Sequence, residues 1–305
     1  MPASARSALR ARFVWTGRAS GRAGTLGEMF GCFVDHVTQR WVRATGQTVD
    51  LSVETWLDGP ASSRAGVVAD EWLAVVTSQL GGTQRREAGL LADLSSLSSR
   101  AFDPRALRPE VVDFYERTSR YRLDVWSQWS PLLWPGGWAI STVFARRLQQ
   151  LSLPLRPLDV AYGIDSSVIA VDAADGAQVG AAWLRKVRAT GQSIYSGWYG
   201  TTRMPASGDP VLRVVFPLPN GSCAVFLTPR NGADGSLVLE SPLGPFGAPG
   251  AYLIVERAGG RASVRRIPIA ETFRVFVDSD GVLRTDHHMR IWHATVVRLH
   301  YRMSP

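Results

Sequence analysis

The feature that most constrains the fold is a series of short hydrophobic stretches, separated by turn residues, that runs from residue 168 to residue 301. Apolar and polar residues alternate within many of them, as in half-buried β-strands. Turn pairs such as Asn220-Gly221 and Gly259-Gly260 favour tight hairpins. No long helical pattern interrupts the series, which excludes βαβ crossovers and predicts an antiparallel meander of about ten strands. The predicted strands cover residues 168–171, 181–188, 194–202, 211–218, 223–228, 237–240, 251–257, 262–269, 272–277 and 282–301.

The last predicted hairpin carries the most informative chemistry. One arm covers residues 272–277, Asp278-Ser279-Asp280-Gly281 forms the turn, and a single long arm continues to residue 301. Alternation places His287 and His293 on the mainly apolar face of this arm. Six residues of extended chain separate them by about 20 Å, too far for both to bind one metal ion. We therefore predict no metal site and no cofactor.

The first third of the chain predicts helices. Residues 1–24 are basic and are expected to form a disordered leader. Thr25-Leu26-Gly27-Glu28 is a capping box that opens a helix, which ends near Gly46. A second helix is predicted over residues 67–80, and Pro109 starts a third that ends near residue 118. Residues 49–57 predict a short strand.

Residues 125–145 form an uncharged, tryptophan-rich segment. Its length would span a bilayer, but prolines, glycines and polar residues interrupt the apolar pattern. We expect an extended stretch and a turn, followed by a helix over residues 138–151 that covers the sheet. The alternative is peripheral membrane contact through residues 126–138, since tryptophan suits the membrane interface. The chain start lacks an apolar signal-peptide core, so the expected location is cytoplasmic, with this peripheral contact as an option.

Charge and motifs narrow the functions further. The net charge of +8 favours anionic partners. Trp183, Arg185, Tyr195 and Tyr199 alternate on neighbouring predicted strands and could stack on bases, but no RNP-like motif accompanies them, so nucleic acid is not expected as a partner. The sequence has no P-loop, GxGxxG, GxSxG or HExxH motif.

His287 is the only catalytic candidate. Asp286 is adjacent in sequence and faces the other way, so a partner must come from another strand. The candidates for that partner are Glu271, Tyr195 and Tyr199. The alternative is a structural histidine that is hydrogen-bonded within the core.

Several landmarks resemble YndJ-like bacterial proteins over residues 109–301. They are Phe114-Tyr115-Glu116, Tyr121, Trp126-Ser127-Gln128-Trp129, Phe216-Pro217-Leu218-Pro219 and Asp286-His287-His288-Met289. In that family a membrane-embedded portion precedes the region, whereas the first hundred residues here show no multi-span pattern. The resemblance implies one domain of an aromatic helix plus a β-meander. It implies no reaction, since the family has no assigned activity.

Together these patterns predict an α+β fold. An N-terminal helical region (25–108) packs beside a domain over residues 109–305, whose antiparallel meander closes or curls into a barrel or half-barrel of lipocalin-like architecture. We expect a non-enzymatic domain that binds a small hydrophobic or anionic amphipathic ligand in its cavity. The alternatives are an enzyme with His287 as general base and an interaction module of a membrane system. The expected ligand-binding residues are Trp126, Trp129, Trp134, Arg284, His287 and Arg290.

Overall fold

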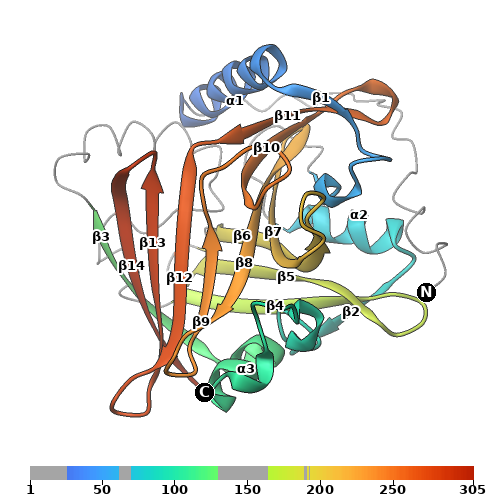
Figure 1. Cartoon of the computed structure of the whole chain (residues 1–305). Coiled ribbons are helices and arrows are strands. Elements are labelled where there is room, and N and C mark those ends of the chain that lie inside the picture. Colours follow the sequence, from blue (N-terminus) through green and yellow to red (C-terminus); the bar gives the residue numbers. More distant parts are fainter. Residues whose placement is uncertain (1–25, 62–69, 130–163, 189–190, 192) are drawn as a thin grey trace.

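A computed structural model of the chain describes residues 26–61, 70–129, 164–188, 191 and 193–305. One 14-stranded antiparallel sheet dominates it, with three α-helices around the sheet (Figure 1). The mostly antiparallel, α+β-like architecture is thereby confirmed. The helices are α1 (Leu26–Thr45), α2 (Glu71–Gln79) and α3 (Pro109–Glu116). The strands are β1 (Gln47–Asp50), β2 (Thr83–Arg86), β3 (Arg122–Trp129), β4 (Ile164–Asp172), β5 (Gln178–Val187), β6 (Ser193–Arg203), β7 (Pro210–Leu218), β8 (Gly221–Asn231), β9 (Leu237–Ser241), β10 (Gly250–Glu256), β11 (Arg261–Ile267), β12 (Ile269–Val277), β13 (Leu283–Ile291) and β14 (Ala294–Ser304).

The main path of the sheet runs β2-β4-β5-β6-β7-β8-β9-β12-β13-β14-β3. It branches at β8. The first part of β8 pairs with β10, which continues to β11 and β1, whereas residues 228–231 pair with β9. The hairpin predicted at Asn220-Gly221 joins β7 to β8, and Asn220 has the positive φ of 56° that such a turn requires.

The sheet curls but does not close. Arg185 on β5 lies 5.8 Å from the Tyr301 ring on β14, although β6, β7, β8, β9, β12 and β13 separate the two strands along the sheet. Closure would require its end strands, β2 and β3, to pair with each other, and no such pairing occurs in the described part of the chain. The closed barrel predicted as one form of the meander is therefore wrong, and a lipocalin-like architecture is not confirmed.

The two faces of the sheet carry separate hydrophobic clusters. Alternation along β5 assigns Trp183 to the concave face and Leu184 to the outer face. On the outer face of β4–β8, β10 and β11, Trp72 from α2 and Trp56 from a short 3-10 helix pack against Trp198 and Tyr252. The concave cluster takes in side chains from both halves of the curl, so the two halves share one core.

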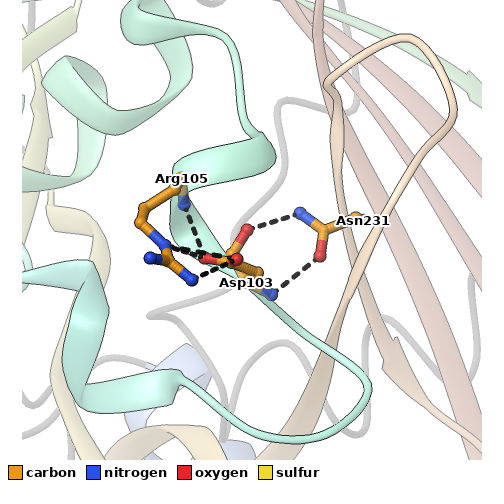
Figure 2. A network of polar contacts seen from close by, with 3 residues as sticks. All are labelled: Asp103, Arg105 and Asn231. Atoms are coloured by element: carbon orange, nitrogen blue, oxygen red, sulfur yellow. Dashed lines mark hydrogen bonds and ion pairs between the residues drawn. The ribbon is translucent and has the colours of Figure 1, made fainter.

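Residues 88–121, which include α3, pack into this concave cluster. Phe114 on α3 lies 6.4 Å from Trp183, measured between ring centroids. Figure 2 shows how the segment is fastened to β8. Asn231 accepts a hydrogen bond from the backbone N–H of Asp103 (2.8 Å) and donates one to its carbonyl (2.9 Å). The Asp103 carboxylate caps the 3-10 turn over Pro104–Ala106, because it accepts hydrogen bonds from the backbone and side chain of Arg105.

Three local predictions need correction. The long last arm is two strands, β13 and β14, joined by a turn at Trp292 and His293, so His293 does not share a strand face with His287. The predicted strand over residues 49–57 is β1 followed by a 3-10 helix over Thr55–Leu57. Residues 126–129 are extended, as predicted, but they belong to β3 and extend the sheet itself beside β14. The leader, Trp134 and the helix predicted over residues 138–151 lie outside the described residues.

Candidate functional site

The predicted binding residues fall on both faces of the sheet. As the alternation predicted, His287 lies on the concave face and is buried, with 6% of its surface exposed. Arg284 and Arg290 differ from it by an odd number of positions on β13 and therefore face outward. Trp126 also faces outward, opposite His300 on β14, and is 53% exposed. The predicted set therefore does not form one site.

The outer residues take part in a surface network. Arg284 forms an ion pair with Asp278 and lies 3.3 Å from His300. The Nδ1 of His300 lies 2.7 Å from Asp286 Oδ1, and Trp126 covers the same imidazole with ring centroids 6.1 Å apart. Arg284 faces outward and already has an anionic partner, so it does not contribute to a site on the concave face. Arg290 is exposed, and the backbone of Trp129 pairs with Val297.

A different set of polar side chains meets on the concave face. The contributing strands are β5, β6, β9, β12, β13 and β14, and the curl brings β5 and β6 opposite β12–β14. On each strand these side chains are an even number of positions from residues of the concave core cluster, so they point to the same face. The set consists of Arg185, Tyr195, Tyr199, Ser241, Glu271, His287 and Tyr301, and we call it the concave polar cluster.

The His287 imidazole is held between a ring and a carboxylate. It stacks on Phe273, its direct partner on β12, with centroids 3.8 Å apart and an interplanar angle of 15°. Its Nε2 lies 3.3 Å from Oε2 of Glu271, one of the three partners considered from the sequence. This contact has a short distance but a geometry outside that of a hydrogen bond, and neither ring nitrogen has a hydrogen-bond partner. We therefore treat it as an electrostatic contact.

Arg185 is the unusual member of the cluster. Only 8% of its surface is exposed, and its guanidinium carbon lies 4.1 Å from the Trp183 ring centroid. The Nε atom has no hydrogen-bond partner, and within the described residues no carboxylate forms an ion pair with this side chain. Arginine is almost never buried unless it is paired, so Arg185 is a candidate to bind an anion.

The tyrosines of the cluster keep their protons. The hydroxyl oxygens of Tyr195 and Tyr199 are in short hydrogen-bond contact. Burial is the main cause that raises the pKa of Tyr195, Tyr199 and Tyr301 above that of free tyrosine. Arg185 partly opposes this rise for all three phenols. Neutral phenols can donate a hydrogen bond to an anion or accept one from a ligand.

Ser241 completes the cluster. It lies opposite Glu271 in the β9–β12 pairing, is fully buried, and its hydroxyl oxygen has no hydrogen-bond partner. Unpaired buried polar atoms of Ser241, His287 and Arg185 thus occur on one face of the sheet. The cluster offers acid–base groups and hydrogen-bonding groups, and the described residues contain no group of three or more His, Cys, Asp and Glu that could hold a metal ion.

Sequence reasoning found part of this cluster but gave it another role. Trp183, Arg185, Tyr195 and Tyr199 were grouped as a stacking surface, whereas Trp183, Arg185 and Tyr199 are buried. The alternation of apolar residues along β5 already indicated that Trp183 and Arg185 point toward the core. Ser241 and Tyr301 were missed as site residues, because only the curl brings β9 and β14 near β5 and β6.

Comparison with known proteins places the chain beside one curated relative. The chain is 29% identical over 244 residues to the "Uncharacterized membrane protein YndJ" of Bacillus subtilis (strain 168). The chain resembles YndJ. The resemblance predicted from the sequence is therefore confirmed. The match covers 78% of this chain and 41% of YndJ, so the chain spans about two fifths of that relative's length.

The remaining comparisons add no function. No protein-family model and no solved structure matches the chain. Across the described residues, no helix is both long enough and apolar enough to cross a membrane. The similarity to YndJ thus identifies a relative but brings no ligand and no reaction.

Proposed function

We propose that this YndJ-like chain is a binding domain whose concave face takes up a small molecule with a polar end and an apolar body. The observation that carries the proposal is Arg185, which is buried without an anionic partner in the described part of the chain. A buried charge of this kind is unfavourable in the empty protein, and a ligand that pairs with it would remove the penalty.

Aromatic side chains beside the polar cluster suit the apolar body. Tyr195 lies 5.5 Å from Phe216 and 5.7 Å from Trp183, both distances between ring centroids, and Phe273 lies under His287. Binding pockets commonly combine such apolar walls with a few placed polar groups.

A thermal-shift screen of a metabolite and lipid library tests the proposal. A ligand that binds only the native protein raises Tm by an amount that increases with the ratio of its concentration to its Kd. We expect hits with the wild type that are lost in Arg185→Met and kept in Arg290→Met, a matched change on the outer face. Hits that are insensitive to both changes would place binding elsewhere on the chain.

The contact between Glu271 and His287 favours an enzyme as a second candidate. A carboxylate 3.3 Å from an imidazole could orient it as a general base toward a ligand in the curl. If the chain is an enzyme of this kind, it converts the bound molecule to a product. His287→Asn should then abolish turnover, and Glu271→Gln should slow it. Unchanged turnover in His287→Asn would exclude it.

The outer face of β3, β13 and β14 favours peripheral membrane contact as a third candidate. Trp126 and Trp292 are 53% and 66% exposed, and Arg290, Arg298 and Arg302 are exposed with no ion pair in the described region. Each arginine near an anionic surface contributes about 1 kcal/mol, and YndJ is itself described as a membrane protein. Cosedimentation with phosphatidylglycerol vesicles, lost in Trp126→Ala/Trp292→Ala, would support this contact. Equal sedimentation with neutral vesicles would argue against a charge-driven interaction.

A further inference from the structure

The concave polar cluster holds one buried cation and one buried carboxylate beside the same phenols. The guanidinium carbon of Arg185 lies 5.4 Å from the Tyr195 ring centroid and 5.8 Å from that of Tyr301. After burial, which is the largest cause, the Glu271 carboxylate also contributes to the raised pKa of both phenols. Arg185 and Glu271 therefore lie on the same concave face as these two phenols.

These two charges do not neutralise each other. Glu271 contacts His287, with 3.3 Å between carboxylate oxygen and Nε2, and in the described residues Arg185 has no ion-pair partner. A cation and an anion that share a buried region usually pair, because each lowers the desolvation cost of the other. Two such charges on one buried face suit a molecule that contacts both of them.

The geometry around Arg185 determines what can bind at its end. Trp183 covers the face of the guanidinium, and the Nε atom at its edge has no hydrogen-bond partner. Guanidinium edges match carboxylate and phosphate oxygens with two parallel hydrogen bonds. The neighbouring phenols can donate further bonds to the same oxyanion.

The other end of the cluster, formed by Glu271 and His287, favours a hydrogen-bond donor over an oxyanion. The Glu271 carboxylate only accepts hydrogen bonds when ionised. The His287 nitrogens are unbonded at the edge of a ring that Phe273 holds in place. A hydroxyl or amino group of a ligand can donate to the Glu271 carboxylate or to an unprotonated nitrogen of His287, whereas a second oxyanion would be repelled by Glu271.

We propose that the concave face binds a bifunctional small molecule, with an oxyanion against Arg185 and a hydroxyl or amino group against Glu271 and His287. This inference rests on the proposed binding function and adds the ligand class to it. Carboxylates and phosphate monoesters share the required oxyanion chemistry, so the test distinguishes them.

Isothermal titration with four probes tests the inference: hydroxyhexanoate, hexanoate, hexyl phosphate and hexanol. In the wild type, hydroxyhexanoate should bind more tightly than hexanoate. The ratio of the dissociation constants of hexanoate and hexyl phosphate identifies the preferred oxyanion. Arg185→Gln should weaken binding of all three anionic probes by about 30-fold or more, and Arg185→Lys by less. Glu271→Gln should weaken hydroxyhexanoate by about tenfold and leave hexanoate unchanged. Arg290→Gln serves as the surface control, and circular dichroism checks the fold of each variant.

The outcomes separate the inference from the function on which it rests. If hexanol binds as tightly as the anionic probes, or Arg185→Gln changes no affinity, the ligand class is wrong while a binding domain remains. If none of the anionic probes binds the wild type, the inference is also overturned. The binding function itself fails only if neutral probes and the broader thermal-shift library give no binding either.

Discussion

His287 lies flat on Phe273, with their ring centroids 3.8 Å apart and their planes 15° from parallel. The stack fixes the imidazole plane, and both ring nitrogens are buried without a hydrogen-bond partner. Glu271, two residues before Phe273 on the same strand face, meets the Nε2 edge at 3.3 Å. One strand therefore supplies both the support for the ring and its electrostatic partner.

Replacing His287 separates a structural role from a binding role. His287→Phe keeps an aromatic ring on Phe273 and removes two unpaired buried nitrogens, so the free energy of unfolding should change by less than about 1 kcal/mol. His287→Ala leaves a cavity and should cost about 2 kcal/mol or more. Urea denaturation measures both changes. If His287→Phe is as destabilising as His287→Ala, the imidazole nitrogens stabilise the fold and are not reserved for a ligand.

Arg185→Met should stabilise the ligand-free protein. A buried unpaired cation is replaced by an apolar side chain, which should raise the free energy of unfolding by about 1 kcal/mol after loss of the contact with Trp183. The control is Arg284→Met, which breaks the ion pair with Asp278 and should lower stability by up to about 1 kcal/mol. Chemical denaturation measures the free energy of unfolding of both variants. A clear loss of stability in Arg185→Met would mean that the guanidinium serves the fold itself.

Asn231→Ala should weaken the attachment of residues 88–121 to β8. It removes both hydrogen bonds to the Asp103 backbone and leaves those partly buried groups unpaired, at a cost of about 1–3 kcal/mol (Figure 2). Arg105→Ala, on the exposed side of the same network, should leave stability nearly unchanged. Hydrogen exchange at Asp103 should accelerate in Asn231→Ala alone. Equal effects of both variants would contradict this assignment.

Acid should destabilise the turn between β8 and β9. A hydrogen bond from the Ser236 side chain is the largest cause that lowers the pKa of Asp234 to about 2, and Arg274 adds to it. A carboxylate with a depressed folded pKa contributes stability above its unfolded pKa of about 4, and loses it as the pH falls toward 2. Because Asp234 is about half exposed, we expect less than about 1 kcal/mol.

Asp234→Asn should remove that part of the acid dependence, and Ser236→Ala should shift it to higher pH. Thermal melts between pH 5 and 2 measure it, under conditions where the wild type still refolds. An unchanged acid dependence in Asp234→Asn would show that other carboxylates are responsible.

The sequence predicted strands well where turns and alternation are local. Asn220-Gly221 marks a hairpin because both residues tolerate the required backbone, and alternation correctly put His287 on the buried face. The turn between β13 and β14 was missed because Trp292, with a φ of 50°, carries none of the usual turn chemistry. The missed turn merged two strands into one and misplaced His293.

The site could be predicted less well, because it depends on non-local pairing. Val125 pairs with Tyr301, and nothing near Val125 in the sequence indicates that β3 joins the sheet beside the last strand. Arg185 meets Tyr301 only through the curl across the intervening strands. Local alternation gives the face of each residue but not its neighbour across the concavity. Arg284 was therefore favoured over Arg185 as the partner of an anion.

Native mass spectrometry of the chain purified from its own host tests the central claim most directly. We predict a co-purifying small molecule on the wild type and on Arg290→Met, and its loss from Arg185→Met. A wild-type protein that is empty as isolated, and that remains empty with a lipid and metabolite panel, would contradict the claim. The concave polar cluster would then be a structural feature of a packed scaffold, and the exposed face with Trp126 and Trp292 would become the surface to study.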